Sequence, residues 1–131
     1  METNLFSPAT VDIGCYRGED VSFDFYVDPP NPSGGIGSWQ PGFSISRYKQ
    51  DKTGALIRIG NPLVDVACEI SDPVVGTFSA SLASSDFFND DGSPTALVPG
   101  TYLWDTWRLV DGSRRVLQSG LFVVLPNARY G

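Results

Sequence analysis

A missing residue type limits the chemistry open to this sequence, because its 131 residues contain no histidine. Ser-His-Asp and Cys-His nucleophilic sites need an imidazole base, and His-based zinc sites need imidazole as a ligand. Asp24 and Asp28 share one face of a predicted strand, and such a carboxylate pair could serve glycoside hydrolysis. A solvated strand face is the commoner reason for such a pair. We therefore predict no catalytic residues and a protein that is not an enzyme.

Three further patterns contain residue types that occur in ligand sites. Residues 89–93, Asn-Asp-Asp-Gly-Ser, contain calcium-type ligands but lack the spacing and the closing Glu of an EF-hand, which favours a plain turn. Residues 34–37, Gly-Gly-Ile-Gly, do not lead from a strand into a helix, so no phosphate cradle is predicted. Cys15 and Cys68 lack metal-ligand spacing and are expected to be buried free thiols rather than a disulfide. No metal and no cofactor is expected.

The charge of the chain bears on its partners. Nine basic and 15 acidic residues give a net charge of −6, and the basic residues look scattered along the sequence. Binding to phosphates needs clustered Lys and Arg, so nucleic acid is not an expected partner. Residues 1–8 lack the basic and apolar regions of a signal peptide, and no apolar run approaches the length of a membrane span. We expect a protein made in the cytoplasm, with no membrane contact.

The elements that would position any site are short strands. The 14 glycines and 10 prolines fall between runs of β-branched and aromatic residues, which is typical of many strands joined by turns. Alternation is clearest over residues 21–28, and Asp111-Gly112 between two long apolar runs indicates a hairpin. The predicted strands cover residues 10–16, 21–28, 43–48, 55–59, 63–70, 76–82, 101–110 and 116–125, with one helical turn near 85–88 and a long Pro- and Gly-rich connection over 28–42.

One motif narrows the fold class. Leu97, Gly100 and Tyr102 belong to an L-x-P-G-x-Y pattern typical of a tyrosine corner, in which the hydroxyl bonds to the backbone just upstream. This pattern predicts an all-β, Greek-key, immunoglobulin-like antiparallel β-sandwich of about seven to nine strands, forming one domain over residues 10–125. Residues 1–9 and 126–131 would be N- and C-terminal arms that order on assembly.

The hairpin that follows the motif has two apolar faces. If Tyr102 points inward, the residues one step along the strand point outward, because side chains alternate. Since an antiparallel sandwich normally shows water a polar face, the outward face needs a cover, either residues 28–42 of the same chain or another protein. The residues of this candidate assembly interface are Leu103, Trp107, Leu109, Leu121, Val123 and Leu125. If Trp107 faces a partner, Trp107→Asp leaves the domain folded and blocks assembly.

The order of these patterns resembles a small β-sandwich domain of tailed-phage structural proteins, the N-terminal domain of baseplate upper proteins. The similarity rests on an opening Ile-x-x-x-Arg-Gly-Glu-Asp and alternating strand, a central Gly-Thr-Phe-x-x-x-Leu, and a closing Leu-x-x-Gly-x-Tyr-x-x-Asp followed by Gly-x-Phe-x-Val. These patterns occupy residues 13–27, 76–82, 97–105 and 120–124.

The resemblance implies a structural protein of the virion, placed at the tail, baseplate or fibre-attachment region. Its expected partners are other phage structural proteins and copies of itself. Two alternatives stay open. A sandwich of this kind could decorate a capsid surface, or it could bind carbohydrate through Trp39, Tyr48 or Trp107.

Overall fold

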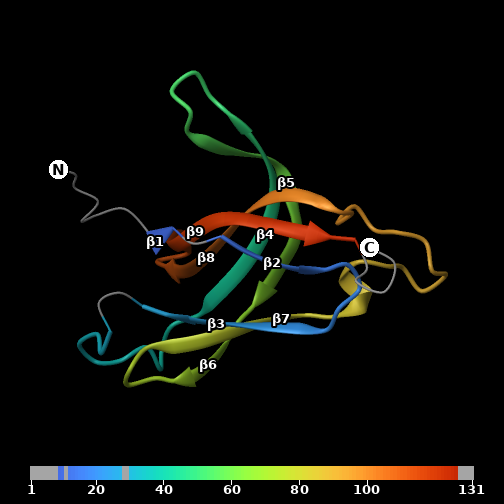
Figure 1. Ribbon diagram of the computed structural model, residues 1–131. Helices are drawn as coiled ribbons and strands as arrows, with labels where there is room; N and C mark the ends of the chain where they lie inside the picture. Colours follow the sequence, from blue (N-terminus) through green and yellow to red (C-terminus); the bar gives the residue numbers. More distant parts are fainter. Residues whose placement is uncertain (1–8, 11, 28–29, 127–131) are drawn as a thin grey trace.

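The computed structural model describes residues 9–10, 12–27 and 30–126, and within them the chain forms nine strands and one short 3-10 turn (Figure 1). The bounds are β1 Ala9–Thr10, β2 Ile13–Tyr16, β3 Val21–Tyr26, β4 Pro41–Gln50, β5 Leu56–Ala67, β6 Glu69–Asp72, β7 Thr77–Leu82, η1 Ser84–Asp86, β8 Gly100–Val110 and β9 Ser113–Leu125. The all-β prediction is confirmed.

The strands form two sheets. Sheet A has the order β1-β9-β8-β4-β5, with β2 also paired to β9, and sheet B has the order β3-β7-β6. The strands β1 and β2 run parallel to β9, whereas every other pair in the described chain is antiparallel. The chain crosses between the sheets after β2, β3, β5 and β7, and the sheets lie against each other as in a β-sandwich (Figure 1).

Aromatic rings from both sheets fill the space between them. Phe25 of β3 stacks on Trp104 of β8 with ring centroids 5.4 Å apart, and it stacks on Phe43 of β4 at 5.7 Å. Phe43 and Trp104 are almost completely buried. These rings remove large apolar areas from water, which is the main contribution to the stability of such a core.

Strand boundaries differ from prediction where a turn signal lies inside a strand. Residues 60–62, Gly-Asn-Pro, separate two predicted segments, yet β5 runs on from Leu56 to Ala67. Gly60 takes a φ of 70°, and the pairing register with β4 shifts at this point, so the extra residues form an irregularity rather than a strand end. At the other hairpin, Asp111 and Gly112 have φ of 52° and 81°, which places the turn at the predicted pair, and β9 begins at Ser113, ahead of the predicted residue 116.

The Pro- and Gly-rich connection is not simply a surface loop. The side chain of Ile36, within this connection, is fully buried in the core. The Ile36 N–H donates a hydrogen bond to the Pro73 carbonyl at 2.8 Å. Trp39 carries the Arg108 guanidinium 3.8 Å from its ring centroid. The described part of this loop therefore closes one end of the sandwich against the β6–β7 turn, and it does not cover the outer face of the β8–β9 hairpin.

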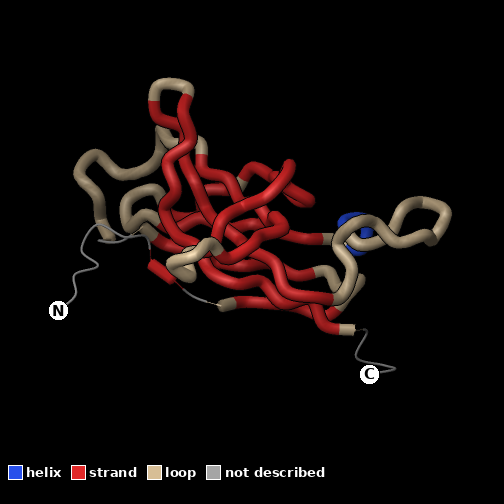
Figure 2. The backbone as a smooth tube through the Cα atoms, turned by 90° about the horizontal axis from the view of Figure 1, so that it is seen from above, coloured by secondary structure: helices blue, strands red, loops and turns tan. Residues whose placement is uncertain are grey.

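The remaining features lie at the ends of the sheets. Figure 2 shows the loops gathered around a strand-rich centre, with the single helical turn, Ser84–Asp86, at one end. Within the described ranges, no helix is long and apolar enough to cross a membrane. Residues 1–8 and 127–131 of the expected arms lie outside the described residues, while Ala9 already pairs with Gln118 of β9.

Candidate assembly surface

The six predicted interface residues differ widely in exposure. Leu109 and Leu125 are 39% and 43% exposed, whereas Trp107 is only 8% exposed. Leu103, Leu121 and Val123 are half-buried. All six belong to the outward parity of β8 and β9, since Tyr102 and Trp104 point into the core between them. Only part of this set therefore offers apolar area to another protein.

Trp107 is covered by its own sheet. Its indole lies against Gly42 of the paired strand β4, so closely that a Cβ on Gly42 would come within 2.1 Å of the ring. The indole N–H donates a hydrogen bond to the Ser44 hydroxyl at 2.9 Å, and the Arg114 guanidinium lies 3.8 Å from the ring centroid. Trp107 is thus part of the packing of the domain, and Trp107→Asp is now expected to destabilise the fold itself.

The same face of sheet A carries a hydrogen-bond network around the Asp65 carboxylate. Asp65 accepts hydrogen bonds from the Ser44 hydroxyl at 2.8 Å and from Arg114 at 2.9 Å. Burial of Asp65 opposes ionisation, but these two hydrogen bonds and the positive charge of Arg114 outweigh it and lower the pKa of Asp65 below 3.8. Arg114 therefore links the indole of Trp107 to an ionised carboxylate across β9, β8, β4 and β5.

Asp105 is the buried charge of this face. It is 4% exposed, and Arg58 of β5 reaches over β4 to form an ion pair with one carboxylate oxygen. The other oxygen, Oδ1, is buried and has no hydrogen-bond partner within the described chain. Burial raises the pKa of Asp105, although the charge of Arg58 pulls it down. This ion pair connects Arg58 of the β4–β5 hairpin to strand β8 of the same sheet.

Next to this ion pair lies an open groove of about 610 Å³ between the β4–β5 hairpin and the β8–β9 hairpin. Its lining residues are Leu56, Ile57, Arg58, Leu103, Asp105, Val116, Ser119 and Gly120. The groove thus combines apolar walls from both hairpins with one ion pair.

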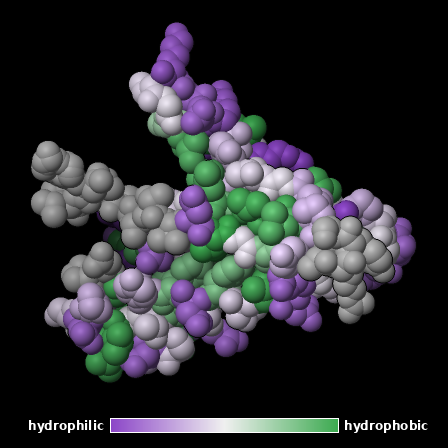
Figure 3. Space-filling model, in the orientation of Figure 1, coloured by the Kyte–Doolittle hydropathy of each residue, from purple (hydrophilic) through white to green (hydrophobic). Residues whose placement is uncertain are grey.

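The tip of the β4–β5 hairpin extends beyond the rest of the protein. Strand β4 pairs with β8 only as far as Ser46, so residues 47–50 and 56–59 pair only with each other. Every residue from 49 to 61 is exposed. Figure 1 shows this hairpin projecting away from sheet B, and Figure 3 shows a hydrophilic tip above a more apolar base. We call residues 47–59 the projecting hairpin.

The projecting hairpin was missed as a site by sequence reasoning. Leu56, Ile57 and Ile59 are 37%, 40% and 39% exposed, which is unusual for three aliphatic residues within one short strand segment. From the sequence, residues 55–59 are predicted as a short strand, with no indication of how exposed their side chains are. Only the pairing pattern shows that β4 separates from β8 after Ser46, although β8 extends to Gly100 and stays paired with β9.

The tyrosine-corner residues lie at the entry to β8. The Tyr102 hydroxyl donates a hydrogen bond to the Val98 carbonyl at 2.5 Å, which is the bond that the motif predicts. Leu97 is 1% exposed. Gly100 has φ of 158° and lies near the Tyr102 ring. These residues shape the backbone at the entry to β8.

Other candidate groups are used locally. Asp91 accepts two hydrogen bonds from Ser93, which lower its pKa and close a plain turn. The partner of Asp24 in the proposed carboxylate pair, Asp28, lies outside the described residues. No group of three or more potential metal-ligating side chains occurs in the part of the chain that the structure describes.

Both cysteines are free thiols. Burial raises the pKa of Cys15 to about 11, with a smaller contribution from the charge of Glu19, and raises the pKa of Cys68 to about 12. The thiolate is the reactive form, so both thiols are poor nucleophiles at neutral pH.

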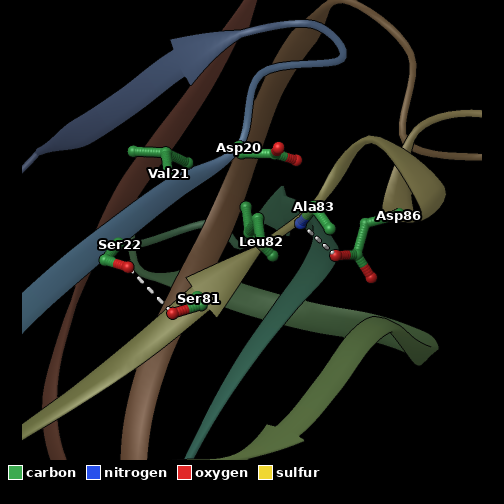
Figure 4. Close-up of a pocket in the computed structure, with 7 residues that line it drawn as sticks. All are labelled: Asp20, Val21, Ser22, Ser81, Leu82, Ala83 and Asp86. Carbon is green, nitrogen blue, oxygen red and sulfur yellow. Dashed lines mark hydrogen bonds between the residues drawn. The ribbon is translucent and has the colours of Figure 1, made fainter.

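An open hollow lies where β3 begins and β7 ends (Figure 4). Its lining residues are Asp20, Val21, Ser22, Ser81, Leu82, Ala83 and Asp86. The Asp86 carboxylate accepts the Ala83 N–H at 2.8 Å, and the Asp20 carboxylate accepts the Ser84 N–H at 3.0 Å. Ser22 and Ser81 share a hydrogen bond of 2.8 Å across the strands. The polar groups of the hollow thus cap the chain turn after β7.

No protein-family model matches the chain, and no curated protein matches it with significance.

Proposed function

We propose that this chain is a non-enzymatic structural protein of a tailed-phage virion, in the tail, baseplate or fibre-attachment region. The observation that carries the proposal is the projecting hairpin, which exposes Leu56, Ile57 and Ile59 beside the groove. Exposed aliphatic residues gathered in one segment mark protein contacts, because hydrophobic area supplies most of the affinity. The phage assignment is supported by the pattern of turns and core residues noted in the sequence.

We also propose that the fold is of the immunoglobulin-like Greek-key type. Strands β3, β7 and β6 correspond to strands B, E and D of that fold, and β9, β8, β4 and β5 to strands G, F, C and C′. Trp104 follows the corner tyrosine by two residues, where antibody domains have the second cysteine. The Phe25–Trp104 ring stack supports this reading, because it links the sheets where a disulfide would.

Binding of carbohydrate is the weaker hypothesis. A stacking platform needs an open aromatic face, but the Trp107 ring is covered by Arg114 and the Trp39 ring by Arg108. Tyr48 is half-buried on the projecting hairpin. A glycan-array signal from the purified protein that disappears in Tyr48→Ala would revive this hypothesis.

The direct test is to locate and count the polypeptide in purified phage particles by cryo-electron microscopy with quantitative mass spectrometry. The proposal predicts a few to a few dozen copies at the tail. Hundreds of copies on the shell would assign the chain to capsid decoration instead. Absence from every particle would reject a virion role.

A matched pair of variants tests the surface. Ile57→Asp should leave the domain folded and abolish incorporation into particles, because a charge would then be buried unpaired at the contact. Val98→Asp is the control, since Val98 has the same 40% exposure but lies at the tyrosine corner. Equal incorporation of the two variants would remove the projecting hairpin from the interface.

A further inference from the structure

The charges of this acidic protein are separated in space. Four of its nine basic residues lie within the projecting hairpin together with one acidic residue, Asp51, which gives that segment a net charge of +3. These basic residues are Arg47, Lys49, Lys52 and Arg58. The rest of the chain has five basic and 14 acidic residues. Four of the nine basic residues are therefore concentrated on one exposed arm of 13 residues.

One face of the projecting hairpin combines cations with aliphatic groups. Arg47 pairs with Ile59 and Lys49 pairs with Ile57, and residues paired across antiparallel strands place their side chains on the same face. Arg47 and Lys49 are exposed, and neither forms an ion pair with another described residue. This face therefore suits a partner that is flat, acidic and partly apolar.

Sheet B offers such a surface. Its three strands contain three carboxylates and no lysine or arginine. Asp24 and Glu69 lie on either side of Ser79 in one cross-strand row, and both carboxylates are exposed. Between neighbouring strands spaced about 4.8 Å apart, the short Ser79 side chain leaves room for an ammonium group between the two carboxylates. Tyr26, which is 59% exposed on the same face, adds apolar area.

We propose that the projecting hairpin of one copy docks onto the outer face of sheet B of a second copy. In the docked pair, Lys49 lies over Ser79 between Asp24 and Glu69, and the two isoleucines cover the neighbouring side chains of the sheet. This inference rests on the proposed function in one respect: both take the projecting hairpin as a protein contact, and the inference names its partner. The two surfaces lie on opposite sides of one copy (Figure 1), so the contact is head-to-tail and generates rings or filaments rather than closed two-fold dimers.

The experiment is sedimentation velocity on the purified full chain at concentrations up to about 1 mM. The concentration is high because the hairpin offers 13 residues, fewer than the roughly 20–30 residues that each partner contributes to a standard interface, and the expected affinity is therefore low. The wild type should associate, and raising the salt from about 0.05 M to 0.5 M should weaken association severalfold. Arg47→Glu/Lys49→Glu should abolish it through the hairpin, and Asp24→Lys/Glu69→Lys should abolish it through the sheet. Arg115→Glu is the control for an exposed basic residue elsewhere.

Mixing the two reversed variants decides the geometry. Each variant keeps one native surface, so the native hairpin of the sheet variant should bind the native sheet of the hairpin variant. The two reversed surfaces are also opposite in charge, so the mixture should form mixed oligomers that neither variant forms alone. Thermal unfolding of each variant checks that it is folded.

Three results would overturn the inference: a monomeric wild type at about 1 mM, association that survives in the sheet variant, or no mixed oligomer when the two variants are combined. Binding of the hairpin to DNA without self-association would assign the arm to another partner and also overturn it. Self-association through these surfaces by a chain absent from phage particles would reject only the proposed function.

Discussion

Trp104 and Trp107 lie three residues apart on β8, on opposite faces of sheet A, and both are buried. Trp104 is covered by rings of the facing sheet, including Phe25. Trp107 is covered by two side chains of its own sheet, Ser44 and Arg114. Its indole occupies the space that a side chain would take at Gly42. One face is buried by a second layer of chain, whereas the other is buried by a single layer of hydrogen-bonded and stacked groups.

The difference shows how an outer sheet face becomes partly dry without a partner. Polar groups on this face are satisfied by one another, and the aromatic ring covers the backbone of the neighbouring strand. The cost is a buried carboxylate, Asp105, with one unpaired oxygen in the described chain. The stability contributed by the inner face depends on the apolar area that is buried. The stability contributed by the outer face depends on hydrogen-bond geometry and on the pairing of charges.

The largest expected effect is on the inner face. Trp104→Ala should lower the free energy of unfolding by about 3–5 kcal/mol, because it leaves a large cavity between the two sheets. Trp107→Ala should cost distinctly less, since water can enter the space above a single layer. Urea unfolding followed by circular dichroism measures both variants. Equal losses would show that the outer layer packs as tightly as the core.

The second effect concerns the packing of the Trp107 indole against Gly42. Gly42→Ala should lower the free energy of unfolding by about 1–3 kcal/mol, because the new methyl group displaces an indole that Ser44 and Arg114 hold in place. In the Trp107→Leu background the same substitution should cost much less. A double-mutant cycle measures this coupling, and additive effects would mean that the ring is not seated on Gly42.

The ion pair comes third. Arg58→Ala should cost about 1–2 kcal/mol at neutral pH, less than for a fully buried pair because Arg58 is 35% exposed. Adding Asp105→Asn should restore most of the loss, because the uncompensated charge is removed. If the double variant is as unstable as Arg58→Ala, the loss comes from packing of the Arg58 side chain rather than from charge.

The two carboxylates of the outer face predict opposite pH dependence. Burial raises the pKa of Asp105, so its folded form holds a proton more tightly, and its contribution to stability falls as the pH rises from 3.8 through the raised value. The hydrogen bonds of Asp65 lower its pKa, so its contribution is present above 3.8 and is lost as the pH falls through the lowered value. Urea unfolding of Asp105→Asn and Asp65→Asn at several pH values separates them; identical profiles would contradict the assignment.

The smallest effect belongs to the tyrosine corner. Tyr102→Phe should lower the free energy of unfolding by about 1 kcal/mol, because one hydrogen bond to the Val98 carbonyl is lost while the ring stays buried. Differential scanning calorimetry detects this change as a small fall in Tm. A neutral effect would mean that water replaces the bond at the surface.

Sequence reasoning predicted the elements whose side chains alternate. Strand β3 matches prediction because Phe23 and Phe25 alternate with polar residues, and the β8–β9 turn matches because Asp111 and Gly112 tolerate positive φ. It placed Trp107 on the correct face of β8. It did not predict that the ring is covered, since the cover depends on Gly42, far away in the sequence, and on how Arg114 folds back across the β8–β9 turn.

The amino-acid sequence by itself determined the all-β character, the inward set of aromatic residues and the tyrosine corner, because alternation and turn chemistry act over a few residues. Tertiary structure alone decided the rest. It set where β4 separates from β8, leaving the projecting hairpin without a neighbouring strand, and it brought Arg58 onto Asp105. Register and pairing length depend on all strands of a sheet at once, so no local pattern encodes which residues remain exposed.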